Sequence, residues 1–245
     1  PEARPETAAS RLVWAVGYFA NEDYFLPRVR VENLPPHLHR GQKFIRPGGI
    51  VLDARLKRHL RTEKKLGYWR WRQNPFTGTR ELDGLRVMMA LINNWDLADD
   101  NTSVYEERSS GPSGVRLRIY MVSDLGSSFG TTGQSWTNAK SKGNLNSYRH
   151  SKFISKITPE YVNFNVPTRL ALDYLFAFPE WVTELRSHWI GRHIPRADAR
   201  WIGQLLGRLS PGQIDDAFRA AGYNSGEAEG YTKVVEGRIA VLRGM

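Results

Sequence analysis

Two polar stretches decide the predicted fold: Asn-Asn-Trp-Asp-Leu-Ala-Asp-Asp-Asn at residues 93–101 and Ser-Asp-Leu-Gly-Ser-Ser-Phe-Gly at residues 123–130. Both are rich in Asn, Asp and Ser, which favour loops because their side chains bond nearby backbone. Carboxylate and amide oxygens are also the ligands that divalent cations such as Mg²⁺ take in proteins. We therefore predict that the two loops together form one site for a metal ion and phosphate.

The residues that precede the first loop have the periodicity of a helix. Between Glu81 and Asn94, apolar residues recur at intervals of three and four, at Leu82, Leu85, Met88, Met89 and Ile92. This spacing is typical of one buried helix face. The polar loop is thus expected to lie on a rigid support.

The residues between the two loops have the pattern of a β-hairpin. Residues 103–106 and 115–123 alternate as strands do, and the segment 109–114 is rich in turn residues. A hairpin returns Asp124 towards Asp96, and Gly126 allows a sharp turn after it. The carboxylate of Asp124 is therefore expected at a strand end, where it can meet a cation.

In this order, the segments resemble the large lobe of the protein-kinase-like fold. The resemblance covers roughly residues 81–133 and rests on Asp96, five residues before Asn101, and on Asp124-Leu125-Gly126. It is closer to atypical families, namely the secretory-pathway casein kinases, the HipA-type kinases, the phosphatidylinositol kinases and a group of bacterial proteins with the same pattern. The resemblance implies that Asp96 is the catalytic base, and that Asn101 and Asp124 bind Mg²⁺ or Mn²⁺ together with ATP.

The chain also departs from these families. They often have Arg-His directly after the catalytic Asp, where this chain has Leu97-Ala98, so no cation is evident for the γ-phosphate. Neither the Gly-x-Gly-x-x-Gly nor the Gly-x-x-x-x-Gly-Lys motif of phosphate-binding loops occurs. We expect weak or no activity from this chain. An incomplete or inactive kinase-like protein is the alternative to an active one. Asp99 and Asp100 are further loop acids, expected to face solvent rather than a metal.

The resemblance implies an α+β, mainly α, single domain. Residues 1–55 would be the end of a small lobe and its hinge, and residues 56–245 a large lobe that ends in a helical bundle. We predict a helix at 5–16, strands at 24–31 and 49–54, and later helices from 167, from 211 and at 225–242. Glu2 or Glu6 would pair with an ATP-binding Lys that lies, with most of the small lobe, upstream of Pro1. The alternative is a surface acid favoured by the helix dipole.

Composition limits the other possibilities. The 245 residues contain no Cys, which excludes disulfides and cysteine chemistry, and no apolar run has the length of a membrane span. A net charge of +10 favours acidic partners. The basic residues are densest at 55–72, around Trp69 and Trp71. This stretch either contacts a polyanion or is a solvated face with the Trp side chains in the core.

Three functions are compatible with these sequence features. The leading hypothesis is an ATP- and Mg²⁺-dependent phosphotransferase that acts on a hydroxyl acceptor, either a protein or a small molecule. A metal-dependent phosphodiesterase or nuclease would use the same three residues, and a non-catalytic polyanion-binding module would use the stretch 55–72. Residues 131–157 occupy the place of an activation segment that grips substrate or phosphate, or are a mobile loop. His37 with His39, and His150, are less favoured as metal or acid-base residues.

Overall fold

The computed structural model describes residues 2–38, 41–59, 63–94, 96–108, 116–130, 142–165 and 188–245. Within these residues the chain is a mixture of helices and small sheets, which confirms the α+β class. The helices are α1 (Ala3–Ala15), α2 (Arg80–Leu91), α3 (Leu145–His150), α5 (Arg196–Leu206), α6 (Pro211–Ala220) and α7 (Ser225–Arg243). Single 3₁₀ turns occur at η1 (Gln42–Phe44), η2 (Asp99–Asn101) and η4 (His188–Gly191).

The strands form three separate sheets. The four-stranded sheet has the order β1 (Phe19–Ala20), β7 (Arg116–Val122), β6 (Thr102–Arg108), β5 (Glu63–Gly67). The second sheet has the order β10 (Ile194–Pro195), β9 (Tyr161–Phe164), β8 (Ile154–Ile157), and the third has the order β2 (Asp23–Arg30), β4 (Ile50–Lys57), β3 (Ile45–Arg46). Strands β6 and β7 pair in antiparallel register, as the hairpin pattern predicts, whereas β1 joins β7 in parallel.

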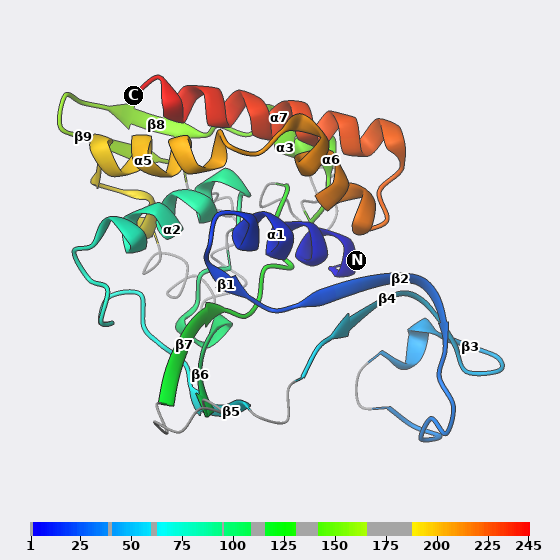
Figure 1. Ribbon diagram of the computed structural model, residues 1–245. Helices are drawn as coiled ribbons and strands as arrows, with labels where there is room; N and C mark the ends of the chain where they lie inside the picture. Colours follow the sequence, from blue (N-terminus) through cyan, green and yellow to red (C-terminus); the bar gives the residue numbers. More distant parts are fainter. Residues whose placement is uncertain are drawn as a thin grey trace, which may run out of the picture.

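The helices form one layer, with the four-stranded sheet on one side of it (Figure 1). Helix α7 packs against α3, α5 and α6, while α1 packs against α6 and α2 against α5. The starts of α6 and α7 are fixed by capping boxes, Ser210 with Gln213 and Asn224 with Glu227. Both boxes satisfy backbone N–H groups at the helix start, so these two helices begin where the local sequence directs. The helix predicted from residue 167 lies outside the described residues.

An aromatic cluster joins the second polar loop to this helical layer. The rings of Phe218 and Tyr231 stack with centroids 4.8 Å apart, and Phe129 lies 5.0 Å from Phe218 and 5.4 Å from Tyr148. All four side chains are buried. Edge-to-face and offset aromatic pairs contribute about 0.5–1.5 kcal/mol each beyond burial. The loop that carries Asp124 is thus anchored in the core through Phe129.

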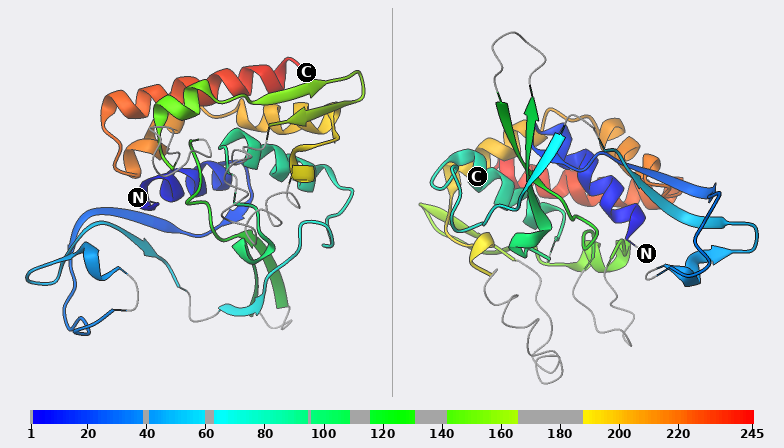
Figure 2. Two further views of the ribbon diagram at one scale, coloured as in Figure 1. Left: turned by 180° about the vertical axis from the view of Figure 1, so that it is seen from behind. Right: turned by 90° about the horizontal axis from the view of Figure 1, so that it is seen from below.

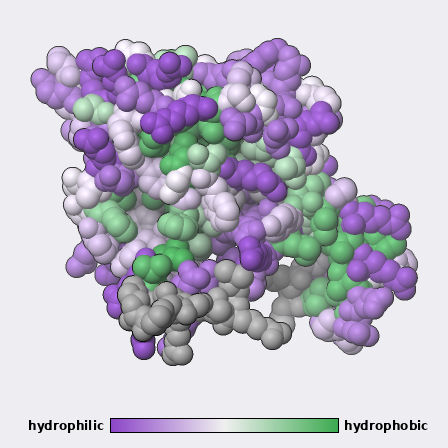
Figure 3. Space-filling view, in the orientation of Figure 1, coloured by the Kyte–Doolittle hydropathy of each residue, from purple (hydrophilic) through white to green (hydrophobic). Residues whose placement is uncertain are grey.

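The third sheet forms an arm that extends to one side of the molecule (Figures 1 and 2). Of the described residues from 24 to 59, none is buried. Apolar side chains gather where the arm meets the body (Figure 3). The arm therefore depends on its attachment to α1 for its position, and not on a core of its own.

Arg238 of α7 connects the helical layer to the end of α2. Its side chain is 6% exposed, and it donates hydrogen bonds to the carbonyls of Ala90 and Leu91 and to Oδ1 of Asn93. It also bonds Ser151 Oγ at 2.7 Å. A buried guanidinium requires such a set of acceptors because its desolvation is costly.

No described helix is both long enough and apolar enough to cross a membrane. That result covers only the residues with a described structure and agrees with the absence of an apolar run in the sequence.

We expect Arg238→Met to lower the free energy of unfolding by about 3–5 kcal/mol, because it leaves buried acceptors without a donor. Urea unfolding followed by circular dichroism measures the change. Lys233→Met on the same helix is the control, since Lys233 forms an exposed pair with Glu229. The control is expected to change stability by less than about 0.5 kcal/mol, and equal losses in the two variants would contradict a structural role for Arg238.

Candidate functional site

The first polar loop begins where α2 ends. Helix α2 stops at Leu91, earlier than predicted, because Asn93 adopts a left-handed conformation with φ of 52°. Asn tolerates this conformation better than most residues. The buried Asn93 side chain donates to Gly130 O at 2.6 Å and to Ser151 Oγ at 2.7 Å. Together with the bond from Phe129 N to Ile92 O at 2.7 Å, these contacts fasten the two polar loops to each other.

Asn94 then connects the backbone of Asp96 to that of Asp124. Its Oδ1 accepts a hydrogen bond from Asp96 N at 3.0 Å, and its Nδ2 donates to Asp124 O at 3.4 Å. The side chain is 1% exposed, so the bridge lies within the protein. The sequence alone predicted no role for Asn94. In the structure this residue positions both Asp96 and Asp124.

Asn101 completes the link between the loops. Its backbone oxygen accepts from Ser123 N at 2.9 Å and from Asp124 N at 3.3 Å, while its Nδ2 donates to Asp96 O at 3.1 Å. Gly126 N donates to Asp124 Oδ1 at 3.1 Å. The structure thus brings Asp96, Asn101 and Asp124 together from the end of a helix, a 3₁₀ turn and the end of a strand.

The electrostatic surroundings of Asp96 favour its protonated form more than water does. Burial raises the pKa of the Asp96 carboxyl, and the nearby charge of Asp124 raises it further, while Lys142 opposes the shift. A carboxylate with a raised pKa is a stronger proton acceptor than an exposed one.

Three cations that the sequence did not assign surround these acids. Arg55 of β4 forms an ion pair with Glu6 of α1, and its Nη1 lies 3.4 Å from Asp23 Oδ2. The charges of Arg55 and Lys57, two residues apart on β4, both interact with Asp124. Lys142 pairs with Glu2 and interacts with Asp96.

Helix α1 packs directly on the second loop. A Cβ atom added at Gly126 would lie 3.1 Å from Glu2 Cβ and 3.3 Å from Glu6 Oε2. A larger residue at this position would require the Glu2 and Glu6 side chains to move by a few tenths of an ångström. Of the two acids considered in the sequence, Glu6 pairs with Arg55 within the chain, and Glu2 pairs with Lys142.

The two predicted metal ligands, Asn101 and Asp124, have the oxygen chemistry that a hard divalent cation requires. The bond from Asn101 Nδ2 to Asp96 O leaves the amide oxygen of Asn101 for a cation. A carboxylate has about four acceptor positions, so the bond from Gly126 leaves capacity on Asp124. Among the described residues, no group of three or more His, Cys, Asp or Glu side chains is placed to hold a metal.

A pocket of about 250 Å³ lies beside this cluster. Phe19 of β1 and Ile119 and Met121 of β7 supply its apolar side, and Lys57 and His59 line it as well. Lys57 lines this pocket, and its charge also interacts with Asp124, so the pocket lies near the second polar loop. The pocket thus has an apolar side, and its polar lining contains both basic residues and the acids Glu22, Glu63 and Glu107.

The other sequence candidates lie elsewhere or have structural roles. Asp99 Oδ1 accepts from Trp71 N at 3.1 Å, and Asp100 is exposed. His37 is exposed and His39 is outside the described residues. The ring of His150 bonds the carbonyl of Asn146, one turn earlier.

In the described part of the basic stretch, residues 55–59 and 63–72, several side chains are paired or packed within the chain. Trp69 and Trp71 are 6% and 3% exposed, which places both in the core. Arg58 pairs with Glu22, and Arg72 lies over the ring of Trp189 at 4.6 Å. Arg58 and Arg72 are thus paired or packed within the chain. The segment after Gly130, described from Lys142, contains helix α3 with the buried Tyr148.

Comparisons with known proteins give no family for this chain. No protein-family model matches it, and neither a curated protein nor a solved structure does. The kinase-like resemblance therefore stays a prediction from the motif residues, and a functional assignment must rest on the site.

The pKa of Asp23 gives a testable pH dependence. Burial raises the pKa of this carboxyl to about 6, from an ordinary value of 3.8. The folded state then holds a proton that the unfolded chain loses, so the contribution of Asp23 to stability falls as pH rises from about 4 to 6 and stays low above that. We expect Asp23→Asn to gain about 1–3 kcal/mol of unfolding free energy relative to wild type between pH 4 and pH 7.

Urea unfolding at several pH values measures this difference. Asp53→Asn, a change at a half-exposed aspartate of β4, is the control and should show no such trend. A parallel pH dependence of wild type and Asp23→Asn would contradict the raised pKa.

Proposed function

We propose that this chain is a phosphotransferase that binds a nucleoside triphosphate with Mg²⁺ or Mn²⁺ and transfers the γ-phosphoryl group to a hydroxyl acceptor. The observation that carries the proposal is the convergence of Asp96, Asn101 and Asp124. Asn94 and Asn101 bond the backbone of Asp96 in their own loop and the backbone of Asp124 in the other loop. Phosphoryl transfer requires positioning and charge stabilisation rather than covalent help from protein.

The surroundings of the three residues support a nucleotide as the substrate. Lys57 and Arg55 near Asp124, and Lys142 near Asp96, are cations suited to the phosphates. The pocket lined by Phe19, Ile119 and Met121 offers apolar surface for a base. Base and triphosphate would thus occupy adjoining parts of one site.

In this proposal each site residue has a distinct task. Asp124 and the amide oxygen of Asn101 hold the cation, which neutralises charge on the phosphates when it is bound. Asp96 accepts the proton of the acceptor hydroxyl, and its raised pKa suits that task. The acceptor oxygen bonds to the γ-phosphorus as the bond to the β–γ bridging oxygen breaks, which releases the nucleoside diphosphate.

We expect Asp124→Asn to abolish Mg²⁺-dependent nucleotide binding. Titration calorimetry with ATP, in the presence and absence of Mg²⁺, measures the loss against wild type. Asp216→Asn, at an exposed position of α6, is the matched control and should bind as wild type does. If wild type binds no nucleotide but binds Mg²⁺ and cleaves a phosphodiester, the phosphotransferase proposal is wrong and metal-dependent hydrolysis replaces it.

Asp96→Asn should separate binding from chemistry. The variant keeps the backbone N–H that bonds Asn94 but loses the proton acceptor, so nucleotide binding should remain. Phosphate transfer from labelled ATP, to the chain itself or to added hydroxyl compounds, should fall by at least about 100-fold. Unchanged transfer in Asp96→Asn would remove this residue from the mechanism.

A further inference from the structure

The arm carries a large share of the positive charge of the chain. Residues 24–59 contain eight Lys or Arg and two Asp or Glu, a net charge of +6, while the whole chain has +10. A surface dominated by one sign of charge attracts partners of the opposite sign. The arm is therefore suited to a partner with several negative charges.

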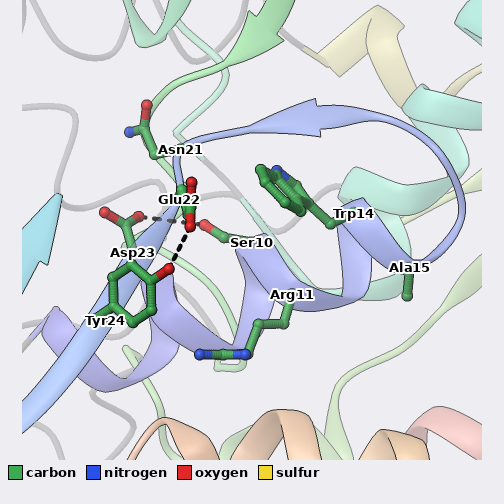
Figure 4. A pocket seen from close by; sticks show the side chains of 8 residues that line it. All are labelled: Ser10, Arg11, Trp14, Ala15, Asn21, Glu22, Asp23 and Tyr24. Atoms are coloured by element: carbon green, nitrogen blue, oxygen red, sulfur yellow. Dashed lines mark hydrogen bonds between the residues drawn. The ribbon is translucent and has the colours of Figure 1, made fainter. Parts of the chain in front are cut away.

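The inner end of the arm is fixed to the body beside α1. Ser10 Oγ of α1 donates to Asp23 Oδ2 at 3.4 Å, and the hydroxyl of Tyr24 donates to Glu22 (Figure 4). From these contacts the strands extend away from the body (Figures 1 and 2). The outer part of the arm can thus reach a partner that is too large for a pocket.

Three arginines share one face of this outer part. In the register of the sheet, Arg28 lies opposite Leu52 and Arg30 lies opposite Ile50. Ile50 pairs on its other side with Arg46 of β3. Side chains of opposed residues, and of residues two apart on a strand, point to the same face. Arg28, Arg30 and Arg46 therefore form one basic face, and all three are exposed.

The charges of this face are not neutralised within the described part of the chain. There, Arg28, Arg30 and Arg46 form neither an ion pair nor a side-chain hydrogen bond, whereas Arg55 pairs with Glu6 and Arg58 with Glu22. Guanidinium groups bind phosphate oxygens through two parallel N–H bonds, which makes arginine the residue suited to phosphate recognition. The basic face has the chemistry for several phosphate groups.

The arrangement of the strands favours a nucleic acid over a lipid surface. A protein segment that lies on a membrane turns apolar side chains into the bilayer while its cations reach the head groups. Here the row of Val29, Val51 and Ile45 is on the face opposite the arginines. Over most of its length the arm is a ribbon of two strands, and the major groove of B-form DNA, about 12 Å wide, admits such a ribbon.

We propose that the outer part of the arm binds double-stranded DNA, with β2 and β4 in the major groove and Arg28, Arg30 and Arg46 against the phosphates. Contacts to phosphates carry no sequence information, so the binding is independent of sequence. The three arginines lie outside the basic stretch at 55–72 and outside the proposed phosphotransferase site.

The first experiment measures the fluorescence anisotropy of a labelled DNA duplex of about 20 base pairs as wild type is added, without nucleotide or metal. Saturable binding is expected. The logarithm of the affinity should fall linearly with the logarithm of the salt concentration, by about 0.9 for each phosphate contact. Absence of saturable binding at low salt overturns the proposal.

Two triple variants then locate the binding surface. The arm variant changes Arg28, Arg30 and Arg46 to Gln, and the control changes Arg200, Arg208 and Arg243, exposed residues of the helical layer, to Gln. Both lower the net charge by three, and circular dichroism verifies that both are folded. The arm variant should bind at least about 10-fold more weakly, with a salt slope reduced by about 2.7, while the control stays near wild type. Equal losses in the two variants overturn the assignment to the arm.

Two further probes test the identity of the partner. Duplex RNA should bind more weakly than DNA, because the major groove of A-form RNA is deep and narrow. Binding to phosphatidylserine vesicles without binding to the duplex would overturn the proposal in favour of a membrane. Since these experiments contain no nucleotide, their failure leaves the proposed phosphotransferase function to be judged by its own experiments.

Discussion

The buried guanidinium of Arg238 is the contact on which the arrangement of both polar loops depends. It binds the last carbonyls of α2, at Ala90 and Leu91, and the side chain of Asn93 at the start of the first loop. Asn93 in turn bonds Gly130 at the end of the second loop. Arg238 thus fixes the end of α2 and, through Asn93, the position of the first polar loop against the second. It does so because each N–H group of a buried guanidinium requires a hydrogen-bond acceptor.

Hydrogen bonds from two further asparagines then position Asp96 and Asp124. Asn94 bonds the backbone at Asp96 and Asp124, and Asn101 bonds the backbone at the same two residues. These contacts use backbone atoms, so the carboxylate groups retain acceptor capacity. Such backbone hydrogen bonds fix the positions of Asp96 and Asp124 and leave their carboxylates able to accept further bonds.

Helix α1 is the element that joins the arm to this frame. Glu6 pairs with Arg55 of the arm, and Glu6 and Glu2 lie against Gly126 of the second loop. Asp23, at the start of the arm, bonds Ser10 of the same helix. Helix α1 therefore sets the distance between the arm's cations and the acids of the loops.

The sequence by itself determined the elements whose signals are local. Helix periodicity located α2 and α7, capping residues located the start of α6, and strand alternation with turn residues located the β6–β7 hairpin. It also placed Asp96, Asn101 and Asp124 in one neighbourhood, because a hairpin returns the chain to its start. Only the tertiary structure decided that Arg55, Lys57 and Lys142 surround these acids, and that Arg238 holds Asn93 from 145 positions away. The physical reason is that a charged side chain is placed by whichever distant partners desolvate and bind it, and no local pattern of the chain records that choice.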